Sequence, residues 1–96
     1  MKEYIKENQE ILKQLKLFVP IVNKVHGKNH PEFSDVLSNY EIINNKLNNN
    51  DFNLSNEFYN LKEITNNYNV PSDVCESYEA VYNMLEKLDV SFNKRK

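Results

Sequence analysis

Residues 72–93 read SDVCESYEAVYNMLEKLDVSFN, and their apolar positions decide the fold class of this chain. These positions recur at intervals of three and four, which is the spacing of one face of an α-helix. They are Val74, Tyr78, Val81, Leu85, Leu88 and Phe92. Asp73, followed three residues later by Glu76, is typical of a capping box that satisfies the free N–H groups of a first helical turn. The stretch therefore predicts a helix over residues 72–93 that buries one face.

The residues before this helix predict a shorter one over residues 54–68. The segment Asn69-Val70-Pro71 would end it, because the residue before a proline is displaced from the helical conformation. Asn53 or Ser55 would cap its N-terminus through a side-chain oxygen.

Residues 25–33, VHGKNHPEF, separate two further helices. Gly27 follows the last apolar positions of the first helix, where a C′ residue in the left-handed conformation is common. Pro31 favours the first position of a new helix over residues 31–47. The asparagine-rich segment 48–51 would end that helix, since such side chains compete for backbone hydrogen bonds. The VHGKNHPEF stretch is therefore interpreted as a corner.

The first helix is expected over residues 3–26, with a kink at Pro20. Its apolar stripe consists of Tyr4, Ile11, Leu15, Phe18, Val22 and Val25, and it keeps its register across the proline. Proline removes one backbone hydrogen bond, and on the outer face it allows a bend that wraps the core. A break into two pieces at Pro20 is the alternative. Four amphipathic helices with short connections predict an all-α fold, an antiparallel four-helix bundle forming a single domain over residues 1–96.

The composition favours this class and excludes several functions. A single glycine leaves little material for the turns of a β-sheet, and a net charge of −2 predicts neither nucleic-acid nor membrane binding. No apolar run approaches the roughly 20 residues that cross a bilayer, and the N-terminus lacks the apolar region of a signal peptide. One cysteine excludes an intrachain disulfide, so a cytoplasmic location is expected.

Two histidines raise the alternative of a metal site. His26 and His30 have the i, i+4 spacing that places two imidazoles on one helix face, and Glu32 and Cys75 would add oxygen and sulfur ligands. That geometry requires a helix running through both histidines, which the glycine and the proline of the corner interrupt. These four residues are the candidate metal ligands, and a structural corner is the favoured interpretation.

Cys75 lies near the expected start of the last helix, where a cysteine can be a reactive thiolate. A buried, small apolar cysteine is the alternative. The sequence contains no glycine-rich phosphate loop, no nucleophile elbow and no E-x-x-H pair. We therefore expect no catalytic residues and no enzymatic activity.

Two stretches resemble a known family. LFVPIVNKVHGKNHPEF (17–33) and ITNNYNVPSDVCESYEAVYNMLEKL (64–88) are similar to the Ric family of di-iron iron–sulfur cluster repair proteins, which are hemerythrin-like helical bundles. The resemblance spans residues 11–88, and residues 66–83 are its most specific part. It implies a cytoplasmic protein that handles iron and helps restore clusters damaged by nitric oxide or oxidants.

The chain departs from that family at the iron ligands. The family holds two irons with histidines and glutamates that include H-x-x-x-E pairs, whereas His26 is followed at that spacing by His30 and His30 by Ser34. Segments 48–51 and 92–95 also lack histidine. No iron-binding residue is carried over, so a complete di-iron centre is not expected, and any iron would bind weakly.

The resemblance predicts a shortened Ric-like protein in iron or iron–sulfur cluster homeostasis or repair under nitrosative or oxidative stress, without a complete di-iron site. The alternative is a non-enzymatic protein-interaction or regulatory helical bundle. A small enzyme of unknown class is the third and least favoured hypothesis. The expected partner is another protein or a second copy in a homodimer, and a metal bound across such a dimer is part of the first hypothesis.

Overall fold

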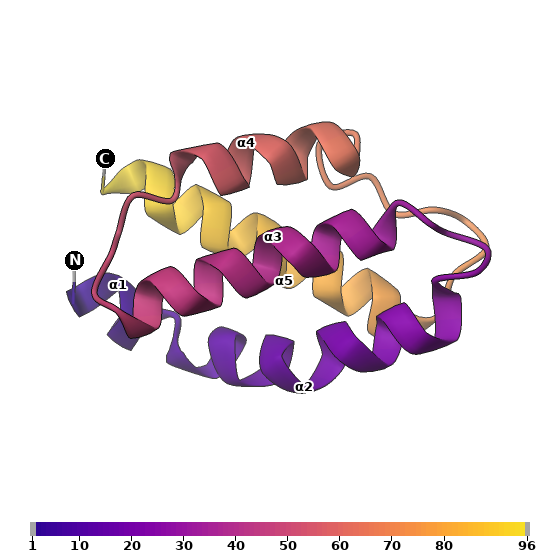
Figure 1. Cartoon of the computed structure of the whole chain (residues 1–96), viewed down its shortest axis with the longest axis horizontal. Coiled ribbons are helices and arrows are strands. Elements are labelled where there is room, and N and C mark those ends of the chain that lie inside the picture. The colour runs from indigo at the N-terminus through magenta and orange to yellow at the C-terminus, as the bar shows by residue number, and fades with distance from the viewer. Residues whose placement is uncertain (1, 96) are drawn as a thin grey trace.

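The computed structural model describes residues 2–95, and every regular element within them is a helix (Figure 1). The five helices are α1 (Lys2–Glu7), α2 (Gln9–His26), α3 (Phe33–Asn48), α4 (Ser55–Ile64) and α5 (Glu76–Lys94). The all-α class predicted from the apolar spacing is therefore confirmed. The Cα radius of gyration is 12.6 Å, close to the value of about 13 Å expected for a compact chain of this length.

The chain reverses direction at each long connection. In Figure 1, α2 runs away from the two termini, α3 returns, α4 runs out again and α5 comes back, while α1 lies beside the start of α2. The strongest helix contacts join α3 to α4, and α2 to both α5 and α3. The α2–α3 and α4–α5 connections consequently lie at the end of the molecule opposite the termini.

One apolar core runs between the helices, and α5 contributes most to it. Of the apolar positions expected to face inward from residues 72–93, Val74 is half-buried and the other five are buried: Tyr78, Val81, Leu85, Leu88 and Phe92. Each such side chain adds roughly 1.5–3 kcal/mol of burial free energy. The face predicted from helical spacing is therefore the face that packs.

The first expected helix is interrupted at Asn8 rather than continuous over residues 3–26. The Asn8 side chain is buried and its amide donates hydrogen bonds to the Tyr4 carbonyl, at 2.9 Å, and to the Ser91 hydroxyl, at 3.0 Å. A side chain that competes for backbone groups disturbs a helical turn. The prediction of one helix was wrong here, whereas α2 continues without interruption through the exposed Pro20.

The corner residues differ in detail from the prediction. Gly27 has φ −58° and ψ −30°, so the expected left-handed conformation was wrong. A methyl group built on Gly27 would instead clash with the Asn23 carbonyl oxygen. The next helix begins at Phe33 rather than Pro31, because the Phe33 N–H donates to the His30 carbonyl at 3.0 Å in a tight i→i−3 turn.

The helix expected over residues 54–68 ends at Ile64. Asn66, Asn67 and Tyr68 have positive φ angles of 51°, 60° and 61°, which an α-helix cannot accommodate. The Thr65 hydroxyl accepts the Tyr68 N–H at 2.7 Å and so stabilises this turn. Leu54 occupies the N-cap position without a side-chain cap, so the caps predicted at Asn53 and Ser55 were wrong.

Candidate functional site

The four predicted ligands lie at the end of the molecule where the α2–α3 and α4–α5 connections meet. His26 is the last residue of α2 and Cys75 is the N-cap of α5, and the His26 Nε2 lies 3.1 Å from the Cys75 Sγ. His30 Nδ1 lies 2.9 Å from Glu32 Oε2. His30 Nε2 lies 2.9 Å from Asp73 Oδ1, which the sequence had not assigned to this site. The fold thus joins residues far apart in the chain.

Asp73 does not form the expected capping box. Helix α5 begins at Glu76 and has no side-chain cap at its N-terminus, and the Asp73 carboxylate contacts His30 instead. The capping prediction was wrong because Cys75 rather than Asp73 occupies the N-cap position, and Asp73 Oδ1 contacts His30. The sequence offered one signal for this contact, an acidic residue shortly after Pro71. Spacing along the chain could not reveal that its partner is His30.

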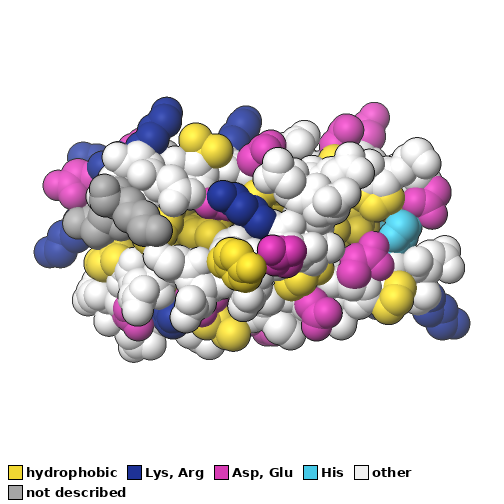
Figure 2. All heavy atoms as spheres, turned by 90° about the horizontal axis from the view of Figure 1, so that it is seen from above, with side chains coloured by type: hydrophobic (Ala, Val, Ile, Leu, Met, Phe, Trp, Pro, Cys, Tyr) yellow, Lys and Arg dark blue, Asp and Glu magenta, His cyan; other side chains and the backbone are white. Residues whose placement is uncertain are grey.

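His30 links the α2–α3 connection to the α4–α5 connection through contacts with two carboxylates. Its hydrogen bond with Glu32 is the main cause that raises its pKa above the ordinary value; burial opposes this effect and Asp73 adds to it. The His30 side chain is 13% exposed, and its carboxylate partners are 38% and 65% exposed. Protonated His30 donates to both carboxylates. Figure 2 shows one histidine at the surface of this end, near acidic side chains.

Tyr78 packs between the two histidines. The ring centroids of His26 and His30 lie 5.4 and 5.5 Å from the centroid of Tyr78. Tyr78 is fully buried, its hydroxyl contacts that of Tyr82 at 2.9 Å, and burial raises its pKa far above the ordinary value. Tyr78 is therefore a neutral packing residue that positions both imidazoles.

The site residues divide into two groups rather than one metal centre. Among residues 2–95, no group of three or more His, Cys, Asp and Glu side chains is arranged to hold a metal ion. Both ring nitrogens of His30 already contact carboxylates, which leaves it no lone pair for a metal. His26 and Cys75 remain an accessible nitrogen–sulfur pair. Because Cys75 is exposed, the alternative of a buried apolar cysteine was wrong.

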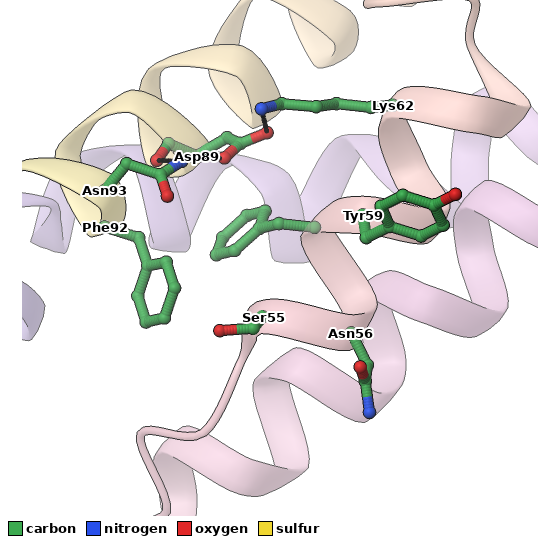
Figure 3. A pocket seen from close by; sticks show the side chains of 8 residues that line it. Ser55, Asn56, Tyr59, Lys62, Asp89, Phe92 and Asn93 are labelled. Carbon is green, nitrogen blue, oxygen red and sulfur yellow. Dashed lines mark hydrogen bonds and ion pairs between the residues drawn. The ribbon is translucent and has the colours of Figure 1, made fainter. Parts of the chain in front are cut away.

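A separate groove of about 350 Å³ lies between α4 and α5 (Figure 3). Phe58 and Phe92 form its apolar part, and Lys62 reaches from α4 toward Asp89. Asp89 is only 1% exposed. It accepts hydrogen bonds from Tyr68 Oη at 2.7 Å and from Asn93 Nδ2 at 2.6 Å. Asp89 was not among the predicted site residues, although it lies one residue after Leu88 on the buried face of α5.

The outer face of α2 contains one departure from the predicted burial pattern. Val25, which was expected to face inward, is 65% exposed. Leu17 and Ile21 are 60% and 54% exposed, and the three side chains recur every fourth residue on one side of the helix. The residues that α2 buries are Leu15, Val19 and Val22. We call Leu17, Ile21 and Val25 the outer row of α2.

Comparison of the chain with protein families, with curated proteins and with solved structures found no match. None of the helices in residues 2–95 is both long and apolar enough to cross a bilayer.

Proposed function

We propose that this protein is a non-enzymatic interaction module and that its protein partner binds the outer row of α2. The observation that carries this proposal is that Leu17, Ile21 and Val25 are each more than half exposed, at 60%, 54% and 65%, on successive turns. Single exposed apolar residues are ordinary, but a contiguous apolar patch marks an interaction surface. Covering the three side chains would supply roughly 3–5 kcal/mol before the cost of association.

The proposal is tested by placing a photo-crosslinking amino acid at position 21 of the full chain, in the cells that produce it. Ile42 is the matched control position, because it is an exposed isoleucine on α3, 44% accessible and outside the row. A discrete adduct at position 21, absent at position 42 and lost when Leu17 is changed to Ser, is expected. No adduct at position 21, or the same adducts at both positions, would contradict the proposal.

The second candidate function is a role in iron or iron–sulfur cluster homeostasis or repair, without a complete di-iron site, as the resemblance to the Ric family implies. The contact of 3.1 Å between His26 Nε2 and Cys75 Sγ favours it. Nitrogen and sulfur ligands of one tetrahedral metal lie about 3.5 Å apart. A small rotation of either side chain would therefore widen the contact between His26 and Cys75 to the distance that a shared metal requires. Further ligands would come from a second copy or from a partner. A cytoplasmic location belongs to this proposal, because an exposed thiol stays reduced there.

Iron content and the visible spectrum after anaerobic purification with ferrous iron test this second candidate. Bound iron should disappear in a variant that combines His26→Asn with Cys75→Ser. His30→Asn is the matched control, because it removes the other histidine and spares the pair, and it should retain the iron. Absence of iron from the unmodified protein, or iron that persists in the double variant, would refute the metal role.

For the fold, we propose that α2 to α5 form an antiparallel four-helix bundle and that α2 bends at Pro20. The alternating helix directions in Figure 1 support the bundle. The exposed position of Pro20 inside α2 supports the bend, because proline leaves the carbonyl four residues earlier without its helical partner.

A further inference from the structure

Lysines accompany the outer row of α2, and acidic residues are absent from that part of the chain. Residues 11–31 contain Lys13, Lys16, Lys24 and Lys28 and no aspartate or glutamate, although the whole chain has 14 acidic against 12 basic residues. All four lysines are exposed. Glu10, the preceding acid on α2, accepts a hydrogen bond from Gln14 Nε2 at 3.3 Å. The segment that carries the outer row is therefore basic, on a chain of net negative charge.

The lysines are arranged along one edge of the apolar row. At about 100° per residue, Lys13 and Lys24 project within roughly 40° of Leu17. The opposite edge is apolar: Phe18, half-buried, follows Leu17 around the helix toward the core. A ligand of the row would thus meet a strip of aliphatic side chains with ammonium groups on one side and at both ends.

We infer that the partner segment is an acidic amphipathic helix, an inference that rests on the proposed interaction function. A helix with apolar residues at i, i+4 and i+8 matches the spacing of Leu17, Ile21 and Val25. Glu or Asp beside that apolar stripe would meet the lysine edge, and complementary charge at a rim speeds association and rejects basic competitors.

A second copy of this chain fits the same surface poorly. Symmetric pairing of two α2 helices would bring Lys13, Lys16 and Lys24 of both copies to one interface, and like charges in contact oppose association. An anionic membrane offers the right charge, but the outer row contains none of the Trp or Tyr that anchor interfacial helices. Charge and shape together select the acidic helix.

Two synthetic 18-residue helical peptides are the probes for this inference. They share one leucine stripe and differ only in their flanking residues, all Glu in one and all Lys in the other. Fluorescence anisotropy with the full chain should show the acidic peptide binding at least tenfold more tightly at 50 mM salt. That ratio should fall severalfold at 500 mM salt, because rim charges are screened.

Variants locate the binding surface. Leu17→Ser combined with Ile21→Ser should weaken acidic-peptide binding at least tenfold, while Ile42→Ser leaves it unchanged. Lys13→Glu combined with Lys24→Glu should reduce the preference for the acidic peptide at least tenfold, and the apolar row stays intact in that variant. Circular dichroism verifies that each variant, changed only at exposed positions, remains folded.

Several results would overturn the inference. Equal binding of the two peptides, tighter binding of the basic one, binding of neither, or insensitivity to Leu17→Ser/Ile21→Ser would each refute an acidic partner. Tighter binding to phosphatidylglycerol vesicles would assign the face to a lipid surface, and self-association abolished by Leu17→Ser/Ile21→Ser would assign it to a second copy. A crosslink at position 21 with no peptide preference would refute only the acidic partner, whereas loss of both would refute the interaction function as well.

Discussion

Replacing Tyr68 with Phe removes one buried hydroxyl that contacts Asp89, a residue that lines the α4–α5 groove. That hydroxyl donates to Asp89 Oδ2 at 2.7 Å, and Asp89 itself is 1% exposed. After the change, Asp89 keeps the Asn93 amide at 2.6 Å and the more distant Lys62 ammonium at 3.8 Å. The substitution therefore weakens the solvation of a buried carboxylate without removing it.

The magnitude follows from the type of hydrogen bond. A hydrogen bond to a charged group contributes about 1.5–3 kcal/mol, and the surviving donors place this loss in the lower half of that range. A loss of about 1.5–2 kcal/mol corresponds to a fall in Tm of roughly 6–16 °C for a domain of this size. Asp89→Ala should cost more, about 2–3 kcal/mol, because the buried Tyr68 hydroxyl is then left without an acceptor, whereas Lys62, whose side chain is 49% exposed, loses little.

Urea unfolding followed by circular dichroism measures these differences, with Tyr40→Phe as the matched control. The Tyr40 hydroxyl is buried and has no hydrogen-bond partner among the described residues, so its removal should be neutral or stabilising. The Tyr68/Asp89 double-mutant cycle should give a coupling free energy of about 1.5–2 kcal/mol. Equal effects of the two Tyr→Phe changes, or a coupling below about 0.5 kcal/mol, would refute the conclusion that the Tyr68 hydroxyl stabilises the buried Asp89 carboxylate.

Three further outcomes are expected. The pKa of His30 is raised in the folded state, so its contribution to stability is complete below the unfolded value of about 6.5 and is lost as pH rises through the higher folded pKa. His30→Gln should cost about 1 kcal/mol or less at pH 5.5 and still less at pH 8.5, since its carboxylate partners are partly exposed; a urea-unfolding difference that does not shrink at the higher pH would contradict this. Pro20→Ala should stabilise α2 by about 1–3 kcal/mol, as thermal unfolding would show, and a lower Tm would argue against strain at this position. His26→Ala should slow iodoacetamide alkylation of the exposed Cys75 severalfold, because the His26 Nε2, 3.1 Å from the Cys75 Sγ, can accept the thiol proton as the sulfur attacks; an unchanged rate would show that the contact does not assist the reaction.

The sequence determined the helical class and most of the buried face of α5. The spacing from Val74 to Phe92 is a local property, because the α-helix repeats every 3.6 residues whatever surrounds it. Local signals from Gly27 and Pro31 also placed a corner at residues 27–32, although Gly27 does not adopt the left-handed conformation on which that prediction relied. It also identified His26, His30, Glu32 and Cys75 as residues to follow, and the fold brings them to one end of the molecule.

The tertiary structure decided the features that depend on distant partners. The first helix is interrupted at Asn8, whose buried side chain contacts Ser91, and the Asp73 carboxylate contacts His30 instead of capping a helix. Val25 shares the helical spacing of the first stripe but is 65% exposed. Periodicity defines an apolar stripe, but the neighbouring helices decide which part of that stripe is covered. The outer row of α2 and the buried Asp89 therefore emerged only once the helices were packed together, because side-chain burial depends on contacts between residues far apart in the chain.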